Sequence, residues 1–323
     1  MRVLVTGGTG LVGAPLVERL LRKGHEVFVL GTVFDERLKA MGAQFVLCDV
    51  MHFNGVLWAF ERVLPDVVYH LAATLDEHSH NLFRLNVGGT RNVLQAVSLV
   101  QKRHALKLFV YPSSIGILSG EKQPIDESAA YAPKTKYERS KMEAELFVLS
   151  SGLPYCVVRS TILIGPNEAW ASIARAARKN QPVLGSGDNA FHLADYRDFV
   201  DLLALLPSRV GKAKNQVFNF AGPDALSYKA TYEVLRRLLG VRDPLKKFPV
   251  HAALMIASAY ESFCLLAGRK PRLTKSRAAI ERLVWEREVD SSKLERVLGF
   301  TARHSTTQAL EHALKVLGKE KRL

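Results

Sequence analysis

The sequence predicts a doubly wound α/β fold, in which a parallel sheet carries helices on both faces, followed by a smaller C-terminal lobe. Short, almost entirely apolar runs alternate along the chain with longer amphipathic stretches, as expected for buried parallel strands joined by helices. The first of these runs leads through three closely spaced glycines into a helix, a unit typical of this architecture. With 323 residues, the chain suits one large domain or two intimate ones.

The first unit consists of an apolar strand at residues 3–5, a glycine turn and an amphipathic helix at 14–23. Gly7 permits the tight turn, Gly10 lets backbone N–H groups approach a pyrophosphate, and Gly13 lets helix and strand pack closely. The pyrophosphate would lie at the positive end of the helix dipole. The sequence therefore predicts a dinucleotide site here rather than a plain structural turn. The residues predicted to form it are Gly7, Thr9, Gly10, Leu11, Val12 and Gly13.

The glycine spacing is Gly-x-x-Gly-x-x-Gly, preceded by Thr6. This differs from the Gly-x-Gly-x-x-Gly of medium-chain dehydrogenases and resembles the short-chain dehydrogenase/reductase superfamily. The resemblance implies a Rossmann-type fold and a nicotinamide cofactor.

Composition and charge exclude several other classes of protein. Hydrophobic residues make up 48% of the chain and charged residues 24%, as in ordinary globular proteins. The net charge is +14, but the basic residues are scattered and no nucleic-acid motif accompanies them, so we expect no nucleic-acid partner. The isolated cysteines Cys48, Cys156 and Cys264 have neither disulfide nor metal spacing. Because the first strand begins at Arg2, we expect no leader peptide and a cytoplasmic protein.

The second strand, predicted at 26–30, normally selects the cofactor at its end. An acidic side chain there binds the ribose 2′-hydroxyl of NAD, whereas an arginine accommodates the 2′-phosphate of NADP. The strand ends in Leu30-Gly31-Thr32, and Asp35 and Arg37 follow a few residues later. The cofactor remains NAD(P), and the missing acid favours NADP through Arg37.

The third and fourth strands, at 45–48 and 67–70, each end in a segment that resembles the superfamily. By that resemblance, Asp49 binds the adenine amino group and the backbone of Val50 holds the ring, although a turn aspartate is the ordinary alternative. Small residues after the fourth strand let the backbone pass beneath the ribose. The segment concerned is Leu71-Ala72-Ala73, in the His-x-Ala-Ala form of the extended branch of the superfamily.

A long helix is predicted at 81–102 and contains Asn86-Val87-Gly88-Gly89-Thr90, which is similar to the Asn-Val-x-Gly-Thr of the extended branch. Glycine inside a helix costs about 1 kcal/mol relative to alanine, so two in succession indicate close packing or a close backbone approach. The resemblance makes Asn86 a candidate for cofactor binding and catalysis.

The catalytic candidates follow the fifth strand, at 108–111, where open α/β sheets bind ligands. Ser114 lies directly after it, and Tyr137 and Lys141 share one helix face at positions i and i+4. An ammonium near a phenol lowers the pKa of the phenol, so that Tyr137 can exchange a proton with a substrate oxygen. Ser114 would donate a hydrogen bond to that oxygen. The pair alone is weak, but glycine turn, Asp49, Asn86, Ser114, Tyr137 and Lys141 occur in the superfamily's order and spacing.

The resemblance covers essentially the whole chain. After a sixth strand at 155–158, the segment 159–166 is similar to the extended branch's Arg-Pro-x-x-x-x-Gly-Pro, which places Thr161 against the nicotinamide. The implied division is a cofactor domain of residues 1–165 plus 195–220 and a substrate lobe of 166–194 plus 221–323. The resemblance also implies a homodimer formed by the helix carrying Tyr137 and its neighbour.

Two departures narrow the substrate class. Ser114 is followed by Ile115-Gly116 and not by the Asp-Glu pair of 4,6-dehydratases. Phe191 stands where sugar-nucleotide epimerases place an arginine for the substrate diphosphate. The segments 185–189, 270–274 and 289–300 resemble the branch of 3β-hydroxysteroid dehydrogenases and dihydroflavonol reductases.

The expected function is therefore hydride transfer between NAD(P) and a secondary alcohol or ketone on a fairly apolar small molecule. The alternatives are a nucleotide-sugar 4-epimerase with tightly bound NAD, or a non-catalytic nucleotide sensor, which has no need of Tyr137. The apolar segment 250–267 is too marginal to span a bilayer and is expected to pack, to line a pocket or to touch a membrane surface.

Overall fold

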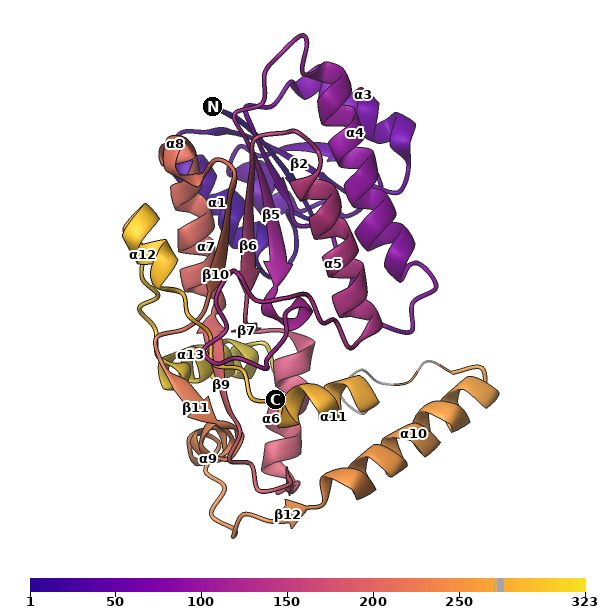
Figure 1. Cartoon of the computed structure of the whole chain (residues 1–323), viewed down its shortest axis with the longest axis vertical. Helices are drawn as coiled ribbons and strands as arrows, with labels where there is room; N and C mark the ends of the chain where they lie inside the picture. Colours follow the sequence, from indigo (N-terminus) through magenta and orange to yellow (C-terminus); the bar gives the residue numbers. More distant parts are fainter. Residues whose placement is uncertain (270, 272–275) are drawn as a thin grey trace.

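The computed structural model describes residues 1–269, 271 and 276–323, so most of the segment 270–274 lies outside the described residues. Its centre is a seven-stranded parallel sheet in the order β10-β6-β5-β4-β1-β2-β3. The predicted doubly wound sheet is confirmed (Figure 1). Its strands are β1 (Arg2–Thr6), β2 (Glu26–Gly31), β3 (Gln44–Leu47), β4 (Val67–His70), β5 (Leu108–Ser114), β6 (Tyr155–Ser160) and β10 (Gln216–Phe220).

Helices cover both faces of this sheet and form two apolar cores. One face carries α1 (Gly13–Arg22), α2 (Glu36–Ala40), α7 (Tyr196–Leu205), α8 (Val210–Ala213) and α12 (Ser292–Leu298). The other carries α3 (Phe53–Val63), α4 (Thr90–Val100) and α5 (Lys136–Leu149). Burial on both faces explains why the central strands read as continuous apolar runs. Short 3-10 turns occupy Ile115–Ile117 and Leu206–Ser208.

The long helix predicted at 81–102 is present as continuous helical conformation over residues 82–100, but it contains a segment that the sequence did not predict. A π-helical segment, Arg84–Gly89, precedes α4, and the helix ends at Val100. A Cβ on Gly89 would lie 2.7 Å from Cγ2 of Val50, which shows how closely this segment approaches the end of β3. The close packing inferred from the glycine pair therefore holds for Gly89, whereas Gly88 has open space around it.

The second lobe lies at the carboxyl edge of the large sheet (Figure 1). It contains a three-stranded sheet, in the order β11-β9-β7, and a two-stranded one. The strands are β7 (Ile162–Ile164), β9 (Ala190–Asp195), β11 (Ala225–Ser227), β8 (Val183–Leu184) and β12 (Lys247–Phe248). The helices are α6 (Glu168–Arg178), α9 (Tyr228–Leu238), α10 (Val250–Leu266), α11 (Arg277–Val284) and α13 (Thr306–Lys319). Between α11 and α13 the chain returns to the large sheet, where α12 packs on β10.

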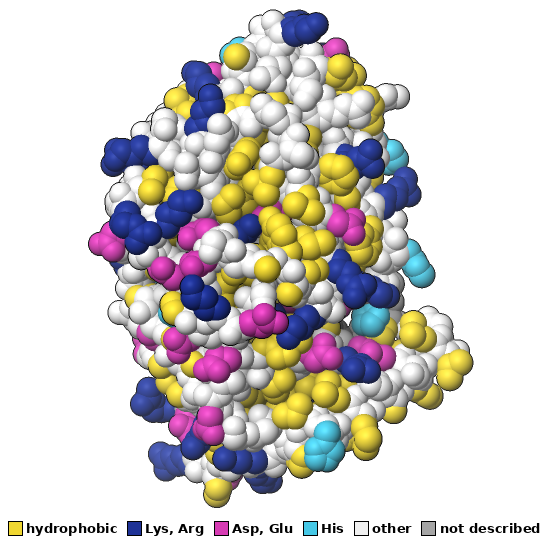
Figure 2. All heavy atoms as spheres, in the orientation of Figure 1, with side chains coloured by type: hydrophobic (Ala, Val, Ile, Leu, Met, Phe, Trp, Pro, Cys, Tyr) yellow, Lys and Arg dark blue, Asp and Glu magenta, His cyan; other side chains and the backbone are white. Residues whose placement is uncertain are grey.

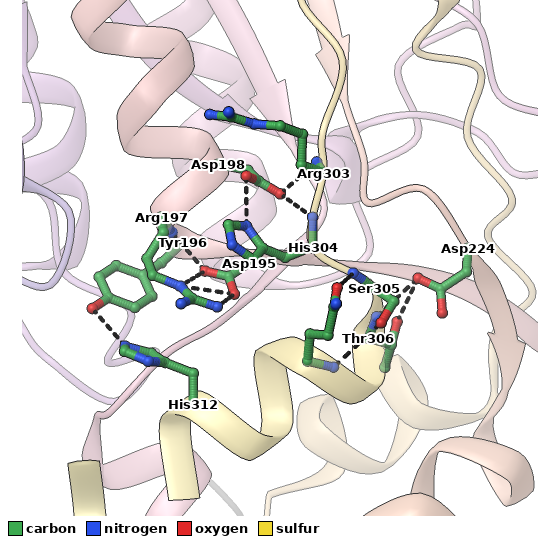
Figure 3. Close-up of polar contacts among 11 residues, drawn as sticks. Asp195, Tyr196, Arg197, Asp198, Asp224, Arg303, His304, Ser305, Thr306 and His312 are labelled. Carbon is green, nitrogen blue, oxygen red and sulfur yellow. Dashed lines mark hydrogen bonds and ion pairs between the residues drawn. The ribbon is translucent and has the colours of Figure 1, made fainter. Parts of the chain in front are cut away.

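Polar contacts fasten the C-terminal segment to the start of α7 (Figure 3). The carboxylate of Asp198 is fully buried and accepts hydrogen bonds from the backbone N–H groups of Arg303 and His304, at 2.9 and 2.8 Å. Nδ1 of His304 lies 2.7 Å from its other oxygen. Farther along, Asp224 accepts from the backbone and hydroxyl of Thr306. These hydrogen bonds fix the start of α13, which then runs across the second lobe.

Candidate active site

The glycine turn between β1 and α1 has the form that a pyrophosphate requires. Gly7 has φ +66°, and a Cβ on it would lie 2.8 Å from the backbone nitrogen of Ala72. A Cβ on Gly13 would lie 2.2 Å from the carbonyl oxygen of Gly7, so any side chain there would break the packing of helix on strand. The first residue before α1, Val12, makes no side-chain cap bond. The helix therefore presents its N-terminal N–H groups next to Thr9, Gly10 and Leu11, as a dinucleotide phosphate would need.

A buried chain of hydrogen bonds fixes the strand ends around this turn. Thr6 Oγ1 accepts from the backbone N–H of Ala72 at 3.1 Å and lies 2.8 Å from Nδ1 of His70. Nε2 of His70 lies 3.0 Å from Oγ1 of Thr90, which donates to the carbonyl of Asn86. These hydrogen bonds are consistent with one arrangement of protons, in which Nε2 of His70 is protonated and donates to Thr90, and Nδ1 accepts from Thr6. This role of His70 was not predicted from the sequence, although a histidine inside an apolar four-residue strand is a usable signal.

The other predicted cofactor residues lie along the same edge of the sheet. Leu71, Ala72 and Ala73 follow β4, and Val50 packs against Gly89. Asp49 follows β3 and accepts from the backbone N–H of Met51 at 2.9 Å, the turn bond of the ordinary alternative. Arg37 lies in α2, more than half exposed, and forms an ion pair with Glu18 of α1. The adenine and 2′-phosphate roles of Asp49 and Arg37 stay predictions.

Lys141 projects from α5 into the carboxyl end of β5. Its ammonium donates to the carbonyl of Pro112 at 2.7 Å and lies 4.1 Å from the ring centroid of Tyr111. The side chain is 5% exposed, and this burial lowers the pKa of Lys141 from 10.5 to about 7. A lysine held at such a pKa beside a strand end is typical of a functional site.

The other two catalytic candidates border the same region. Tyr137 is half-buried in the first turn of α5, one helical turn before Lys141. A capping box between Thr135 and Glu138 fixes the start of this helix. Ser114 ends β5, and its Oγ accepts from the backbone N–H of Gly116 at 3.1 Å, so its O–H remains available to a ligand.

Asn86, the fourth candidate, is buried and its amide is engaged by the protein itself. Its Oδ1 accepts from the backbone N–H of Thr74 at 2.8 Å, and its Nδ2 donates to Thr74 O and to Oγ of Ser140. The side chain thereby ties the loop after β4 to α5 between Tyr137 and Lys141. In this structure Asn86 positions the two elements that carry the site.

A small cavity opens at Ser114. Its walls come from the end of β5, from β6 and β7, from β9 and from the chain after α11, and the lining residues are Ser114, Ile115, Gly116, Ser160, Thr161, Ile162, Phe191, His192 and Arg287. Oγ1 of Thr161 is buried without a hydrogen-bond partner among the described residues. Nδ1 of His192 accepts from the backbone N–H of Val289, and burial lowers the pKa of His192, so its neutral ring carries its proton on Nε2. His192 and Arg287 were not predicted as site residues from the sequence.

A buried ion pair braces α5 behind the site. Arg159 of β6 donates to Oε1 of Glu145 through Nε and Nη2, at 3.0 and 2.6 Å. Tyr131 donates to the same oxygen at 2.8 Å. Glu145 lies one helical turn after Lys141, so this pair fixes the face of α5 that carries the catalytic candidates. Among the described residues, no group of three His, Cys, Asp or Glu side chains is placed to hold a metal ion.

Known proteins resemble this chain in sequence and in fold. The 3beta-hydroxysteroid-dehydrogenase/decarboxylase isoform 1 of Arabidopsis thaliana is 28% identical, over 92% of this chain and 75% of that protein. The 3 beta-hydroxysteroid dehydrogenase/Delta 5-->4-isomerase of Mycobacterium tuberculosis is 27% identical, over 97% and 89%. Among solved structures, the Bordetella bronchiseptica enzyme WbmG in complex with NAD and UDP superposes with a TM-score of 0.77 at 22% identity, covering 99% of this chain and 96% of that one.

The family model described as the NAD dependent epimerase/dehydratase family matches residues 3–221, which include the glycine turn, the large sheet and all the catalytic candidates. The superfamily resemblance drawn from the motifs is thereby confirmed. The chain belongs to the NAD dependent epimerase/dehydratase family.

Proposed function

We propose that the protein is an NAD(P)-dependent oxidoreductase acting on a secondary alcohol or ketone of a fairly apolar substrate. The observation that carries the proposal is the buried Lys141, whose pKa of about 7 and position one turn from Tyr137 suit acid–base work beside Ser114. The nicotinamide, when bound, would supply or accept the hydride. The glycine turn and the uncapped start of α1 fit the dinucleotide that carries it.

The side chains divide the remaining work. Ser114 donates its O–H to the substrate oxygen and stabilises charge as it develops there. Tyr137 exchanges the proton with that oxygen, and a protonated Lys141 favours the phenolate form needed in the oxidising direction. Asn86 holds the loop after β4 against α5, which keeps the cofactor edge and the catalytic helix in register.

The cavity wall is mixed, with an apolar part that would contact a hydrophobic substrate and the polar side chains of Ser114, Ser160 and Arg287 around it. Ile115, Ile162 and Phe191 form apolar parts of its wall, beside the polar groups of Thr161 and His192. Two relatives that match more than nine-tenths of this chain are named hydroxysteroid dehydrogenases, which is consistent with an alcohol on a hydrophobic ring system.

A sugar-nucleotide 4-epimerase is the second candidate, and one contact favours it. Phe191 occupies the position expected of a diphosphate-binding arginine, but Arg287 pairs with Phe191 across a β-bridge and lines the same cavity. Its guanidinium lies 3.5 Å from the buried carboxylate of Glu138, which balances the charge. Arg287, from the C-terminal segment, thus lies beside Phe191, the position where epimerases place their diphosphate-binding arginine.

The test begins with the purified protein, from which any bound nucleotide is released by denaturation and identified by mass spectrometry. Stoichiometric NAD would indicate an epimerase that recycles its hydride. A protein that instead binds NADH or NADPH reversibly fits the oxidoreductase, and the same titration tests the preference for NADP through Arg37. Turnover of a panel of hydroxysteroids and other apolar alcohols is then followed by nicotinamide absorbance.

Tyr137→Phe is the decisive variant for the mechanism. It should lower kcat by about 10²–10⁴-fold and leave cofactor affinity unchanged, because only the exchangeable proton is removed. Tyr155→Phe is the matched control and should retain activity, because Tyr155 begins β6, at the end of the strand away from the cavity. Full turnover by Tyr137→Phe would refute the proposed role of the phenol.

A further inference from the structure

Helix α10 has its large apolar side chains on the outside. The residues it buries are small, Ala253, Ala257 and Cys264. The side chains it exposes are large and apolar, with exposed fractions of 68% for Met255, 61% for Ile256, 64% for Phe263, 66% for Leu265 and 90% for Leu266. A surface helix of a globular protein ordinarily shows the reverse arrangement. Clustered large side chains on one exposed helix indicate an interaction surface rather than scattered surface residues.

The surface is convex and stands away from the body of the molecule. In Figure 1, α10 extends from β12 along the lower edge of the second lobe, with α11 beside it. Figure 2 shows hydrophobic side chains on the protruding end of this arm. The single acidic residue of α10, Glu261, is directed to the body, where it accepts from the backbone N–H of Arg277 at 3.0 Å and lies 4.0 Å from Nε2 of His78. The outer face therefore carries no carboxylate of its own helix.

Basic residues flank the helix at both ends. Residues 242–249 contain three basic side chains against one acidic, and Arg242, Lys246 and Lys247 are exposed. Residues 267–275 contain four basic side chains and no acidic one in the sequence, and Arg269 is exposed. An apolar face between two cationic ends complements a bilayer surface that carries anionic headgroups.

We infer that α10 is an interfacial anchor that lies in the surface of an anionic phospholipid bilayer. Met255, Ile256, Phe263, Leu265 and Leu266 (the α10 face) would insert among the acyl chains, while the flanking lysines and arginines contact phosphate. None of the described helices is long and apolar enough to cross a membrane, and the 17 residues of α10 reach about 26 Å, short of a hydrocarbon core of roughly 30 Å.

The basic flanks of α10 argue against a second copy of this protein as the binding partner of the α10 face. Two α10 helices packed face to face, in either direction, would bring cationic flanks together at both ends, because both flanks of each helix are basic. An anionic lipid surface meets both flanks favourably at once. The inference concerns the surface of α10 and stands whether the enzyme is an oxidoreductase or an epimerase.

The experiment is flotation of the full-length protein with vesicles of phosphatidylcholine alone or with 30% phosphatidylglycerol. The protein should float with the anionic vesicles and be released by 0.5 M NaCl, since salt screens the flanks. The triple variant Ile256→Ser/Phe263→Ser/Leu266→Ser should lose vesicle binding by about tenfold or more, because its buried apolar area falls. Trp58→Ser, which removes a half-exposed aromatic from α3, is the matched control and should float like the parent protein.

Unfolding curves and light scattering are recorded beside the flotation. They distinguish a loss of membrane binding from unfolding of the variant and from a change in oligomeric state. The triple variant should unfold at the parent's temperature, since its substituted side chains are mostly exposed. No flotation of the parent protein, or flotation unchanged by the triple substitution, would overturn the anchor. So would a parent protein that ignores vesicles but dissociates into smaller species when the α10 face is substituted, which would make the occupant another protein surface.

Discussion

His70 shows how one buried side chain can hold the cofactor edge together. It connects β1 to α4 through Thr6 and Thr90, and both of its ring nitrogens are used. Complete burial lowers the pKa of His70 from 6.5 to about 3, since a charged ring would lose its solvation. A proton would also turn Nδ1 into a second donor and break the bond from Thr6.

Replacing His70 by glutamine should therefore flatten the dependence of stability on pH. In the folded protein His70 stays neutral down to about pH 3, whereas the unfolded chain takes up this proton near pH 6.5. Its contribution to stability is present above pH 6.5 and is lost as the pH falls. Between pH 7 and pH 5 the parent protein should lose about 2 kcal/mol more unfolding free energy than His70→Gln. Urea unfolding at the two pH values measures this, and equal losses would contradict a neutral His70.

Replacing Lys141 should change the pH dependence of stability and should also lower turnover. Its pKa of about 7 in the folded protein, against 10.5 unfolded, means that the unfolded chain binds the extra proton between these values. Stability contributed by this group therefore rises as the pH increases from 7 to 10.5. Lys141→Met should lack this gain, about 2 kcal/mol between pH 7 and pH 9, and should also lose turnover by at least about 10²-fold. A variant that is less stable than its parent at pH 7 and keeps turnover would show a structural lysine instead.

At the residue scale, the sequence predicts side chains that share one local motif better than those that meet through the tertiary fold. Ser114 follows a strand, and Tyr137 and Lys141 share a helix face, so their placement at one strand end follows from local patterns. His192 and Arg287 reach the cavity through the pairing of β9 with the chain after α11, across nearly a hundred residues. No spacing rule links them, because their proximity arises from the long-range register.

At the element scale, the central strands were predictable because burial on both faces leaves them almost purely apolar. The helix predicted at 81–102 is present, but its π-helical segment was not predictable, since it goes with the close approach of Gly89 to Val50. Likewise, the sequence assigned no partner to the Arg159 side chain, whose guanidinium donates to Glu145 on α5. The partner of an arginine in a strand cannot be predicted before the position of the helix that packs on the strand is known.

The pair of Arg159 and Glu145 should dominate the stability of α5. Arg159→Met leaves the Glu145 carboxylate buried, with Tyr131 as its remaining hydrogen-bond donor among the described residues, which should cost about 3–5 kcal/mol. The double variant Arg159→Met/Glu145→Leu removes both charges and should recover most of that loss. Urea unfolding of the single and double variants measures the difference. Additive losses in the double variant would contradict a coupled buried pair.

At the scale of the whole molecule, charge and apolar surface are distributed unevenly. Part of the net charge of +14 comes from the basic residues on either side of α10 in the sequence, and the expected lack of a nucleic-acid partner stays a prediction. The predicted division into two lobes stays a prediction, and α12, which lies in the predicted substrate lobe, packs on the large sheet. Composition set the size and class of the fold, but the crossing of the C-terminal segment depends on tertiary contacts such as those of Asp198 (Figure 3).

A second exposed apolar surface lies on the outer sides of α4 and α5. Leu99, Leu146 and Phe147 are each between about a third and a little over half exposed, on the two helices through which the family resemblance predicts a homodimer. An isologous contact there would bury the same side chains twice, once from each subunit. Leu146→Glu should then place two like charges in the contact and give a monomer, with little effect on unfolding of the isolated chain. Size-exclusion chromatography with light scattering measures the mass, and Trp58→Glu on α3 is the control. A parent protein that is monomeric at micromolar concentration, or a dimer that survives Leu146→Glu, would place the assembly surface elsewhere.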